Sequence, residues 1–222
     1  MTLIPIMIIC LVVAVVLLIA GEYAGRKVWI YQFKPLASGL IVALIVASFF
    51  FNEVGTGYKL AMLFGMLFCF GGDIALMFDA PKAFIAGLLL FLCGHIIYAA
   101  TLLTYGDYHW FDPIATPVIA VISVLIYLFL FSSLGSLKVP VLIYVLAITV
   151  MVDSALLTFH TSFFNTVQSW YLSIGAVLFY ISDVMLAFNK FKIPFKHNRL
   201  SLAFYFAGQL LIALSTHYTA LL

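Results

Sequence analysis

The chain has 222 residues, of which 66% are hydrophobic and only 8% are charged, and its mean hydropathy is +1.25. A water-soluble domain carries about 25% charged residues, so this composition offers too little polar surface to cover an exterior that faces water. The sequence therefore predicts an integral membrane protein and excludes a separate soluble catalytic domain. A net charge of only +2 gives no indication of nucleic-acid binding.

Eight apolar segments are bounded by charged residues, glycine, proline or asparagine, and each is long enough to cross a bilayer as an α-helix. Backbone groups in hydrocarbon must be hydrogen-bonded within their own segment, as they are in a helix. The predicted fold class is an all-α bundle of eight transmembrane helices that forms one domain over residues 1–222. The predicted spans are 3–20, 34–51, 60–78, 83–104, 114–132, 139–159, 166–189 and 199–219.

Basic residues divide unevenly between the two sets of loops, and lysine and arginine in short loops are retained on the cytoplasmic side. Alternate loops hold nine of the ten basic residues, and the opposite loops hold only Lys59. Both termini are therefore predicted on the non-cytoplasmic face. No basic residue precedes the first span, which favours a retained helix over a cleaved signal peptide. The nine residues are Arg26, Lys27, Lys34, Lys82, Lys138, Lys190, Lys192, Lys196 and Arg199.

An internal resemblance links the third and seventh spans. Residues 65–82 read GMLFCFGGDIALMFDAPK and residues 175–192 read GAVLFYISDVMLAFNKFK, so Gly65 matches Gly175 and Asp73 matches Asp183 at an offset of 110. Two halves, 1–112 and 113–222, of four helices each would run in the same direction as a parallel repeat. Two explanations of this match are open at this point. The halves share a common ancestor, or the match is a coincidence in a sequence dominated by a few apolar residue types.

Asp73 and Asp183 are the main candidates for chemistry. Counted from the charged inner boundary at about 1.5 Å per residue, each lies roughly 10 Å inside the bilayer on the cytoplasmic side. An intramembrane carboxylate is costly unless it is paired, hydrogen-bonded, protonated or wet, and it is a functional candidate by default. The alternative is that two buried acids only join helices through hydrogen bonds.

Other polar residues are placed within or at the mouths of the spans. Those predicted to bind or orient a substrate are Lys34, His95, Tyr98, Ser182, Asn189, Tyr205 and Gln209. No acid-rich or His-x-x-x-His pattern accompanies His95, so no metal site is expected. Asp153 and His160 lie toward the outer boundary and are interpreted as packing or entrance residues. The three cysteines, Cys10, Cys69 and Cys93, are interpreted as small apolar packing residues.

This ordered set of motifs resembles the YhhN-like lysoplasmalogenases, a family of small multi-span membrane proteins. The matching stretches cover most of the chain and are Lys34-Pro35-Leu36, Gly65 to Asp73, Phe84 to Gly87, Phe91, His95, Tyr98, Gly175-Ala176, Ser182-Asp183, Asn189, Phe191, Tyr205 and Gln209. The resemblance implies hydrolysis of the vinyl ether bond of a lysoplasmalogen. The implied products are a fatty aldehyde and glycerophosphoethanolamine or glycerophosphocholine, with membrane lipid as the surroundings.

The chemistry of a vinyl ether suits two carboxylates. Protonation of its β carbon leaves an oxocarbenium ion, water adds, and the hemiacetal collapses to aldehyde and alcohol. Paired carboxylates serve an oxocarbenium-like transition state in glycoside hydrolysis, and neighbouring acids in a poorly solvated site tend to share one proton. We predict Asp73 and Asp183 as the catalytic pair, with no metal or organic cofactor required; which of them is the acid stays open.

Three alternatives use the same residues differently. The first is a transporter or channel in which the two aspartates form a proton or cation site. The others are a metal-dependent membrane hydrolase that uses His95 and a receptor-like bundle without catalysis. Transporter repeats are commonly inverted with broken helices, whereas these halves would be parallel and their spans lack internal prolines, which favours the enzyme. The expected location is the plasma (inner) membrane if the source is bacterial, with the site open to the cytoplasm.

Overall fold

The computed structural model of the chain describes residues 3–50, 55–106, 111–192 and 199–217. Within these ranges the protein is all-α, with eight α-helices, two short 3-10 turns and no sheet. The helices are α1 (Leu3–Tyr23), α2 (Lys27–Ser48), α3 (Thr56–Ala75), α4 (Pro81–Tyr105), α5 (Ala115–Phe131), α6 (Lys138–Leu157), α7 (Thr166–Phe191) and α8 (Leu200–Leu214). The 3-10 turns are η1 (Gly135–Leu137) and η2 (Thr158–His160), which flank α6.

Six helices are long and apolar enough to cross a membrane, namely α1, α2, α3, α4, α6 with its flanking turns, and α7. The other two, α5 and α8, are shorter apolar helices of 17 and 15 residues. The chain is therefore an integral multi-pass membrane protein, and the predicted all-α membrane fold is confirmed. The prediction of eight full spans is confirmed for six of them.

Local sequence explains where two of the helices begin. Pro81 opens α4, at a position where its missing N–H would have had no helical partner. Asn165 and Gln168 form a capping box at the start of α7, in which each side chain accepts a hydrogen bond from the other residue's backbone. These two starts lie within two residues of the predicted spans 83–104 and 166–189.

The second predicted span, 34–51, is the one displaced furthest. The helix starts at Lys27, because the segment before Lys34 continues the helical turn from Arg26, whose carbonyl accepts the Trp29 N–H at 3.0 Å. Lys34 is therefore two turns inside α2 rather than at its mouth, and Pro35 lies within the helix. The expectation that the spans lack internal prolines is wrong for α2.

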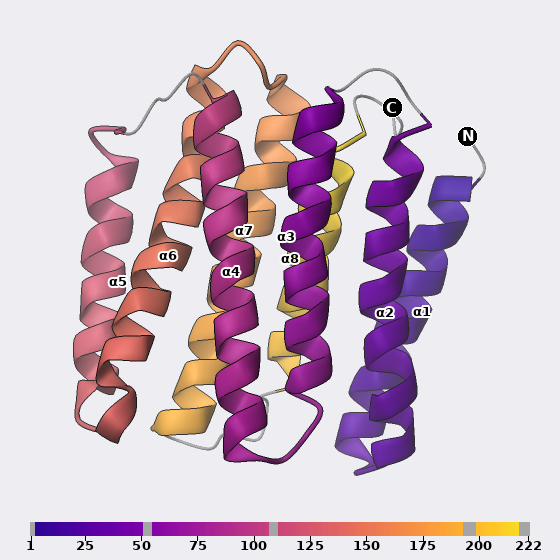
Figure 1. Cartoon of the computed structure of the whole chain (residues 1–222), viewed down its shortest axis with the longest axis vertical. Helices are drawn as coiled ribbons and strands as arrows, with labels where there is room; N and C mark the ends of the chain where they lie inside the picture. Colours follow the sequence, from indigo (N-terminus) through magenta and orange to yellow (C-terminus); the bar gives the residue numbers. More distant parts are fainter. Residues whose placement is uncertain (1–2, 51–54, 107–110, 193–198, 218–222) are drawn as a thin grey trace.

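Successive helices run in opposite directions, and the start of α1 and the end of α8 lie at the same end of the bundle (Figure 1). Every basic residue that the structure describes, apart from Lys59, belongs to the opposite end, which we call the basic end; Lys196 lies outside the described residues. The uneven division of lysine and arginine between the two sets of loops is therefore also found in the folded structure. That the basic end faces the cytoplasm stays a prediction.

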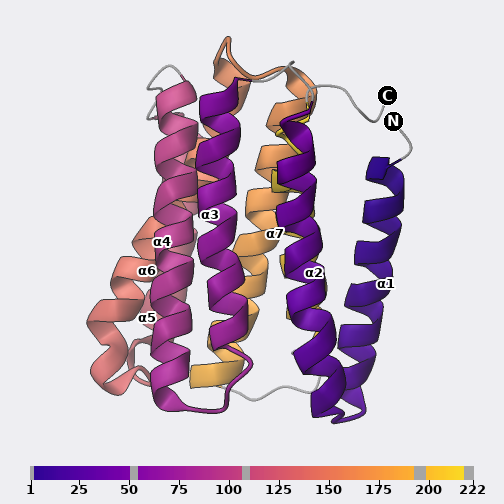
Figure 2. The same cartoon turned by 45° about the vertical axis from the view of Figure 1, so that its right-hand side comes forward.

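The helices form a bundle with α1 at one edge and α5 at the other, while α7 and α8 pass behind α3 and α4 (Figure 1). Figure 2 shows the same outer position of α1 from a second direction. Glycines permit the closest approaches: a Cβ on Gly175 would lie 2.9 Å from the Gly208 carbonyl oxygen, and one on Gly94 would lie 3.2 Å from that of Gly65. Small residues at helix interfaces are the usual means of tight packing in membranes.

Cysteine burial differs from site to site. Cys69 is buried in the core, and a Cβ added to Gly94 would lie 2.6 Å from its sulfur, so it packs as expected. Cys93 is partly buried, and Cys10 is exposed on the outside of α1. A packing role within the bundle therefore fits Cys69 best.

Gly175→Ala is expected to lower the stability of the protein, because the added methyl group would press on the backbone of α8. Overpacking of this kind costs about 1–3 kcal/mol. Gly39→Ala is the matched control, since a Cβ at Gly39 in α2 meets nothing within 4 Å. Thermal unfolding in detergent measures both variants, and an unchanged midpoint for Gly175→Ala would show that α7 and α8 pack less closely than described.

Candidate active site

Asp183 lies on α7, and its carboxylate is held by side chains from two other helices. The Tyr144 hydroxyl of α6 donates a hydrogen bond to Asp183 Oδ2 at 2.6 Å, and His95 Nε2 of α4 lies 3.2 Å from the same oxygen. His95 Nε2 and the Tyr144 oxygen are 3.1 Å apart, so the three groups close a triangle. His95 is fully buried, whereas the Asp183 side chain is 15% exposed. We call these three residues the Asp183 cluster.

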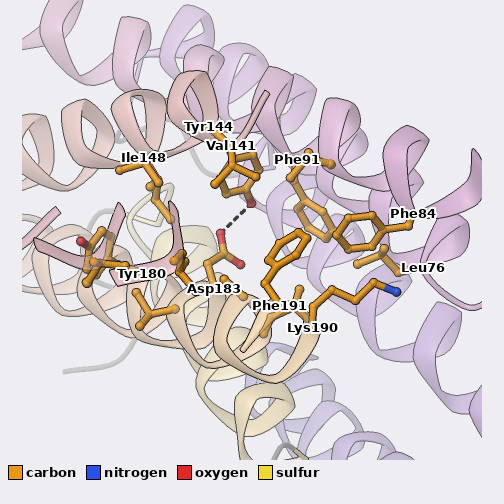
Figure 3. Close-up of a pocket in the computed structure, with 17 residues that line it drawn as sticks. Leu76, Phe84, Phe91, Val141, Tyr144, Ile148, Tyr180, Asp183, Lys190 and Phe191 are labelled. Carbon is orange, nitrogen blue, oxygen red and sulfur yellow. Dashed lines mark hydrogen bonds between the residues drawn. The ribbon is translucent and has the colours of Figure 1, made fainter. Parts of the chain in front are cut away.

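The Asp183 cluster stands on the wall of an apolar pocket formed by α4, α5, α6 and α7 (Figure 3). Most of the wall consists of aliphatic and aromatic side chains, including Phe84, Phe91 and Phe191, and the cavity volume is about 70 Å³. In Figure 3 the Asp183 carboxylate points toward Tyr144, among these side chains. The pocket thus surrounds one carboxylate with apolar surface.

A wider cavity of about 750 Å³ adjoins the apolar pocket at the basic end, and we call it the vestibule. Four residues line both spaces: Leu76, Phe84, Leu186 and Lys190. The charged and amide side chains of the vestibule are Glu22, Lys34, Asp79, Asn189, Lys190 and Arg199. A charged entrance therefore leads to a narrow apolar pocket, with Asp183 on the pocket wall.

Asp73, in the last turn of α3, is only 2% exposed and lines neither cavity. The hydroxyls of Ser38 and Tyr205 each donate a hydrogen bond to its Oδ2 at 2.6 Å, and Lys34 Nζ lies 3.6 Å from its Oδ1. Lys34 itself reaches the vestibule. We call these four residues the Asp73 cluster. Asp73 thus contacts Lys34 from outside the vestibule that the lysine lines.

The two acids occupy neighbouring clusters and share no partner among the residues that the structure describes. Aromatic rings connect the clusters: Tyr205 meets Phe179 with ring centroids 5.1 Å apart, and Phe179 meets His95 at 4.7 Å. Phe91, a wall residue of the pocket, also contacts Tyr205 at 5.7 Å. No hydrogen bond joins the two carboxylates within the described chain, so a shared proton stays a prediction.

The two acids lie at different distances from the basic ends of their own helices. Asp73 lies two residues before the end of α3, and Asp183 lies eight residues before the end of α7. At about 1.5 Å per residue these separations are about 3 and 12 Å. A common depth of the two acids in the bilayer therefore stays a prediction.

The internal repeat reappears in the contacts of the two clusters. Asp73 has two partners from its own half, Ser38 and Lys34, and one from the other half, whereas Asp183 has one from each. Three matched pairs lie at the same offset of 110: Lys34 and Tyr144, Asp73 and Asp183, and His95 and Tyr205. The partners of one acid therefore occupy the positions that correspond to the partners of the other, which supports the proposal of two repeated halves.

The remaining predicted residues have other positions. Tyr98 donates a hydrogen bond to Gln209 Oε1 at 3.1 Å in the core, outside both clusters, and Ser182 bonds to neither acid. Asn189 lines the vestibule. At the other end of the bundle, Asp153 accepts a hydrogen bond from Thr116 at 2.8 Å, and His160 lies 3.6 Å from Asp112, as expected for residues far from the acids.

Sequence reasoning missed Ser38 and Tyr144, although each places a hydroxyl 2.6 Å from an aspartate. Ser38 follows Lys34 by one helical turn, which was a usable signal on the same face of α2. Tyr144 is one of 12 tyrosines, and only its match to Lys34 at the repeat offset distinguishes it. Among the described residues, no group of three or more His, Cys, Asp or Glu side chains is arranged to hold a metal ion.

Lys34→Met is expected to destabilise the protein by about 3–5 kcal/mol, because it leaves Asp73 buried without its cation. Adding Asp73→Asn should recover much of that loss, since an uncharged pair needs no counter-ion. Lys27→Met is the control, because the Lys27–Asp79 pair is almost fully exposed and is worth about 0–1 kcal/mol. Unfolding midpoints test this, and equal losses in the single and double variants would contradict it.

Fold and site together define an α-helical multi-pass membrane protein with an acid-bearing apolar pocket behind a charged vestibule. The chain matches the YhhN family over residues 2–216 and belongs to that family.

Two curated relatives carry the name lysoplasmalogenase TMEM86A. The human protein is 31% identical over 175 residues, which cover 72% of this chain and 69% of the relative. The Bos taurus protein is 30% identical over 159 residues, which cover 68% of this chain and 62% of the relative. The match thus spans about two thirds of the length of these relatives. No solved structure matches the chain at a significant level.

Proposed function

We propose that this protein hydrolyses the vinyl ether bond of lysoplasmalogens to a fatty aldehyde and glycerophosphoethanolamine or glycerophosphocholine. Membership of the YhhN family and the name of the two relatives support this substrate class. The observation that carries the proposal is the position of Asp183, bound to Tyr144 and His95, in an apolar pocket that adjoins a charged vestibule.

A lysophospholipid has the same two parts as this site, one apolar chain and one charged head group. With the chain in the pocket, the phosphate lies in the vestibule, where Lys34, Lys190 and Arg199 supply positive charge. The vinyl ether joins the two parts of the lipid, so it lies close to Asp183. The basic end, and with it the vestibule, is proposed to face the cytoplasm.

The proposed reaction begins with Asp183 in its protonated form. Its proton moves to the β carbon of the vinyl ether, the carbon–carbon π bond is consumed, and positive charge spreads over the α carbon and the ether oxygen. The carboxylate that results is held by Tyr144 and His95 and stabilises this cation.

Water then completes the reaction. It adds to the α carbon and returns a proton to Asp183. The hemiacetal loses the glycerol oxygen as an alcohol, taking the hydroxyl proton with it, and the aldehyde remains. One water is consumed, and Asp183 ends in its starting form.

Asp73 is proposed to support the reaction without touching the reacting bond, because it lines neither cavity. Its contact with Lys34 directs that lysine toward the phosphate in the vestibule. Asp73 is therefore a positioning residue, and its loss should raise KM more than it lowers kcat.

Asp183→Asn is expected to reduce aldehyde release from a 1-alkenyl lysophospholipid by about 10²–10⁴-fold, because the amide cannot donate the proton. Tyr144→Phe should cost about 10- to 100-fold, the value of one hydrogen bond to a charged group. Asp153→Asn, an acid of α6 outside both clusters, is the control and should keep full activity. Full activity in Asp183→Asn would contradict the mechanism. Absence of aldehyde release by the unmodified protein would favour the transporter interpretation.

Lys190→Gln is expected to raise KM about two- to five-fold with little change in kcat, because it removes one exposed cation from the phosphate. Lys82→Gln is the matched control, since Lys82 lies near the basic end but lines neither cavity. Steady-state kinetics in detergent micelles distinguish the two variants. A similar KM in both would place the head group outside the vestibule.

A further inference from the structure

The apolar pocket is too short to enclose the chain of a membrane lipid. From Asp183 to Tyr180, the wall residue of α7 furthest from the basic end, there are three residues, or about 5 Å along the helix. One lipid chain spans about half of the roughly 30 Å hydrocarbon core, which is about 15 Å. A chain whose vinyl ether lies beside Asp183 must therefore leave the pocket.

Beyond Tyr180, in the direction away from the basic end, polar groups close the pocket. Tyr180 shares a hydrogen bond of 2.8 Å with Ser123 of α5, and the Thr149 hydroxyl of α6 lies 2.7 Å from the same serine oxygen. These three residues, which we call the hydroxyl knot, join α5, α6 and α7 at the closed end of the pocket. An apolar chain that ran through them would leave hydroxyls unpaired in a dry environment.

The side of the pocket formed by α5 is the least firmly packed. Only Ser123 and Leu130 of α5 are buried, and the helix packs against α6 and, to a smaller extent, α7. On the lipid-facing side of the seam between α5 and α7, Val177 and Ile181 of α7 are exposed. The seam therefore separates the pocket from lipid by few contacts.

Two contacts mark the ends of this seam. The hydroxyl knot lies at one end, and the ring pair Phe129 and Phe188, with centroids 5.3 Å apart, lies at the other. Between them α5 runs from residue 123 to residue 129, about 9 Å of helix. Ile126, a pocket-wall residue, is at the midpoint, and Val184 is the wall residue of α7 next to Asp183.

We propose that the seam between α5 and α7 is a lateral portal through which the alkenyl chain extends into the bilayer, with Ile126 at its centre. The proposal rests on the proposed function and concerns which part of the substrate the protein encloses: the vinyl ether and the first few carbons of the chain. The methyl end stays in lipid. Long-chain substrates therefore need the seam to open, whereas a chain of about four carbons does not.

Ile126→Trp tests the portal by filling its centre with a larger side chain. We expect at least a tenfold loss of kcat/KM for a 16-carbon 1-alkenyl lysophospholipid and less than a threefold loss for a four-carbon analogue. Leu125→Trp is the matched control, because Leu125 is the neighbouring residue and is exposed on the outside of α5. Equal losses on both substrates, or no loss on either, would overturn the proposal.

A reversible cross-link provides a second test that does not depend on the bulk of tryptophan. In a chain whose native cysteines are replaced by alanine, Phe129→Cys with Phe188→Cys should join α5 to α7 on oxidation. Long-chain activity should then fall and return on reduction, while short-chain activity persists. The control pair is Phe159→Cys with Trp170→Cys, whose rings are 5.1 Å apart at the opposite end of the bundle. Unchanged long-chain activity in the oxidised seam variant would contradict the portal.

Binding without turnover separates the portal from the proposed function. A 1-alkyl lysophospholipid has no vinyl ether to hydrolyse, and a diazirine at its methyl end labels whatever lies there. We expect label on residues 118–129 of α5 and 177–184 of α7, less of it in Ile126→Trp, even if the protein releases no aldehyde. Label confined to other helices would overturn the portal, and absence of aldehyde from the unmodified protein would overturn only the proposed function.

Discussion

The need to partner charge inside an apolar bundle is the constraint on which the rest of this structure depends. Two carboxylates lie within the bundle, and other helices bring hydrogen-bond donors to each of them. Asp73 contacts side chains of α2 and α8, while Asp183 contacts side chains of α4 and α6. With α3 and α7, which carry the acids, six helices are tied together. The two left out, α1 and α5, are the helices at the edges (Figure 1).

The correspondence of the two clusters explains how one bundle obtains a closed acid and an open one. Matched positions hold Lys34 in one half and Tyr144 in the other. With the lysine, Asp73 becomes half of a buried ion pair, and of the Asp73 cluster Lys34 is the member that lines the vestibule. With the tyrosine, Asp183 has a neutral donor and remains partly exposed to the pocket. The difference at this one repeat position thus accompanies a buried, ion-paired acid in one half and a partly exposed acid in the other.

The adjoining cavities give the Asp183 cluster its chemical setting. The vestibule carries charges of both signs at the basic end, whereas the pocket offers one carboxylate among apolar walls. In the proposed function, these two spaces orient a molecule with one charged and one apolar part so that its junction lies at the carboxylate. Low surrounding polarity strengthens the interaction of that carboxylate with a developing positive charge. The same edge helix that forms the outer pocket wall, α5, has the fewest ties to the bundle.

Composition and periodicity by themselves determined the membrane class, most helix bounds, the one-sided placement of basic residues and the choice of Asp73 and Asp183, because each follows from the energetic cost of placing polar groups in lipid. The offset of 110 between the two acids was also visible in the linear chain. Only the tertiary structure decided which residues meet them. Tyr144 and Ser38 look like many other hydroxyls in sequence, and Lys34 seemed to begin a span that in fact starts at Lys27. Cross-helix contacts such as His95 with Asp183 depend on how helices far apart in sequence pack, and helical periodicity carries no information about the neighbour a face will meet.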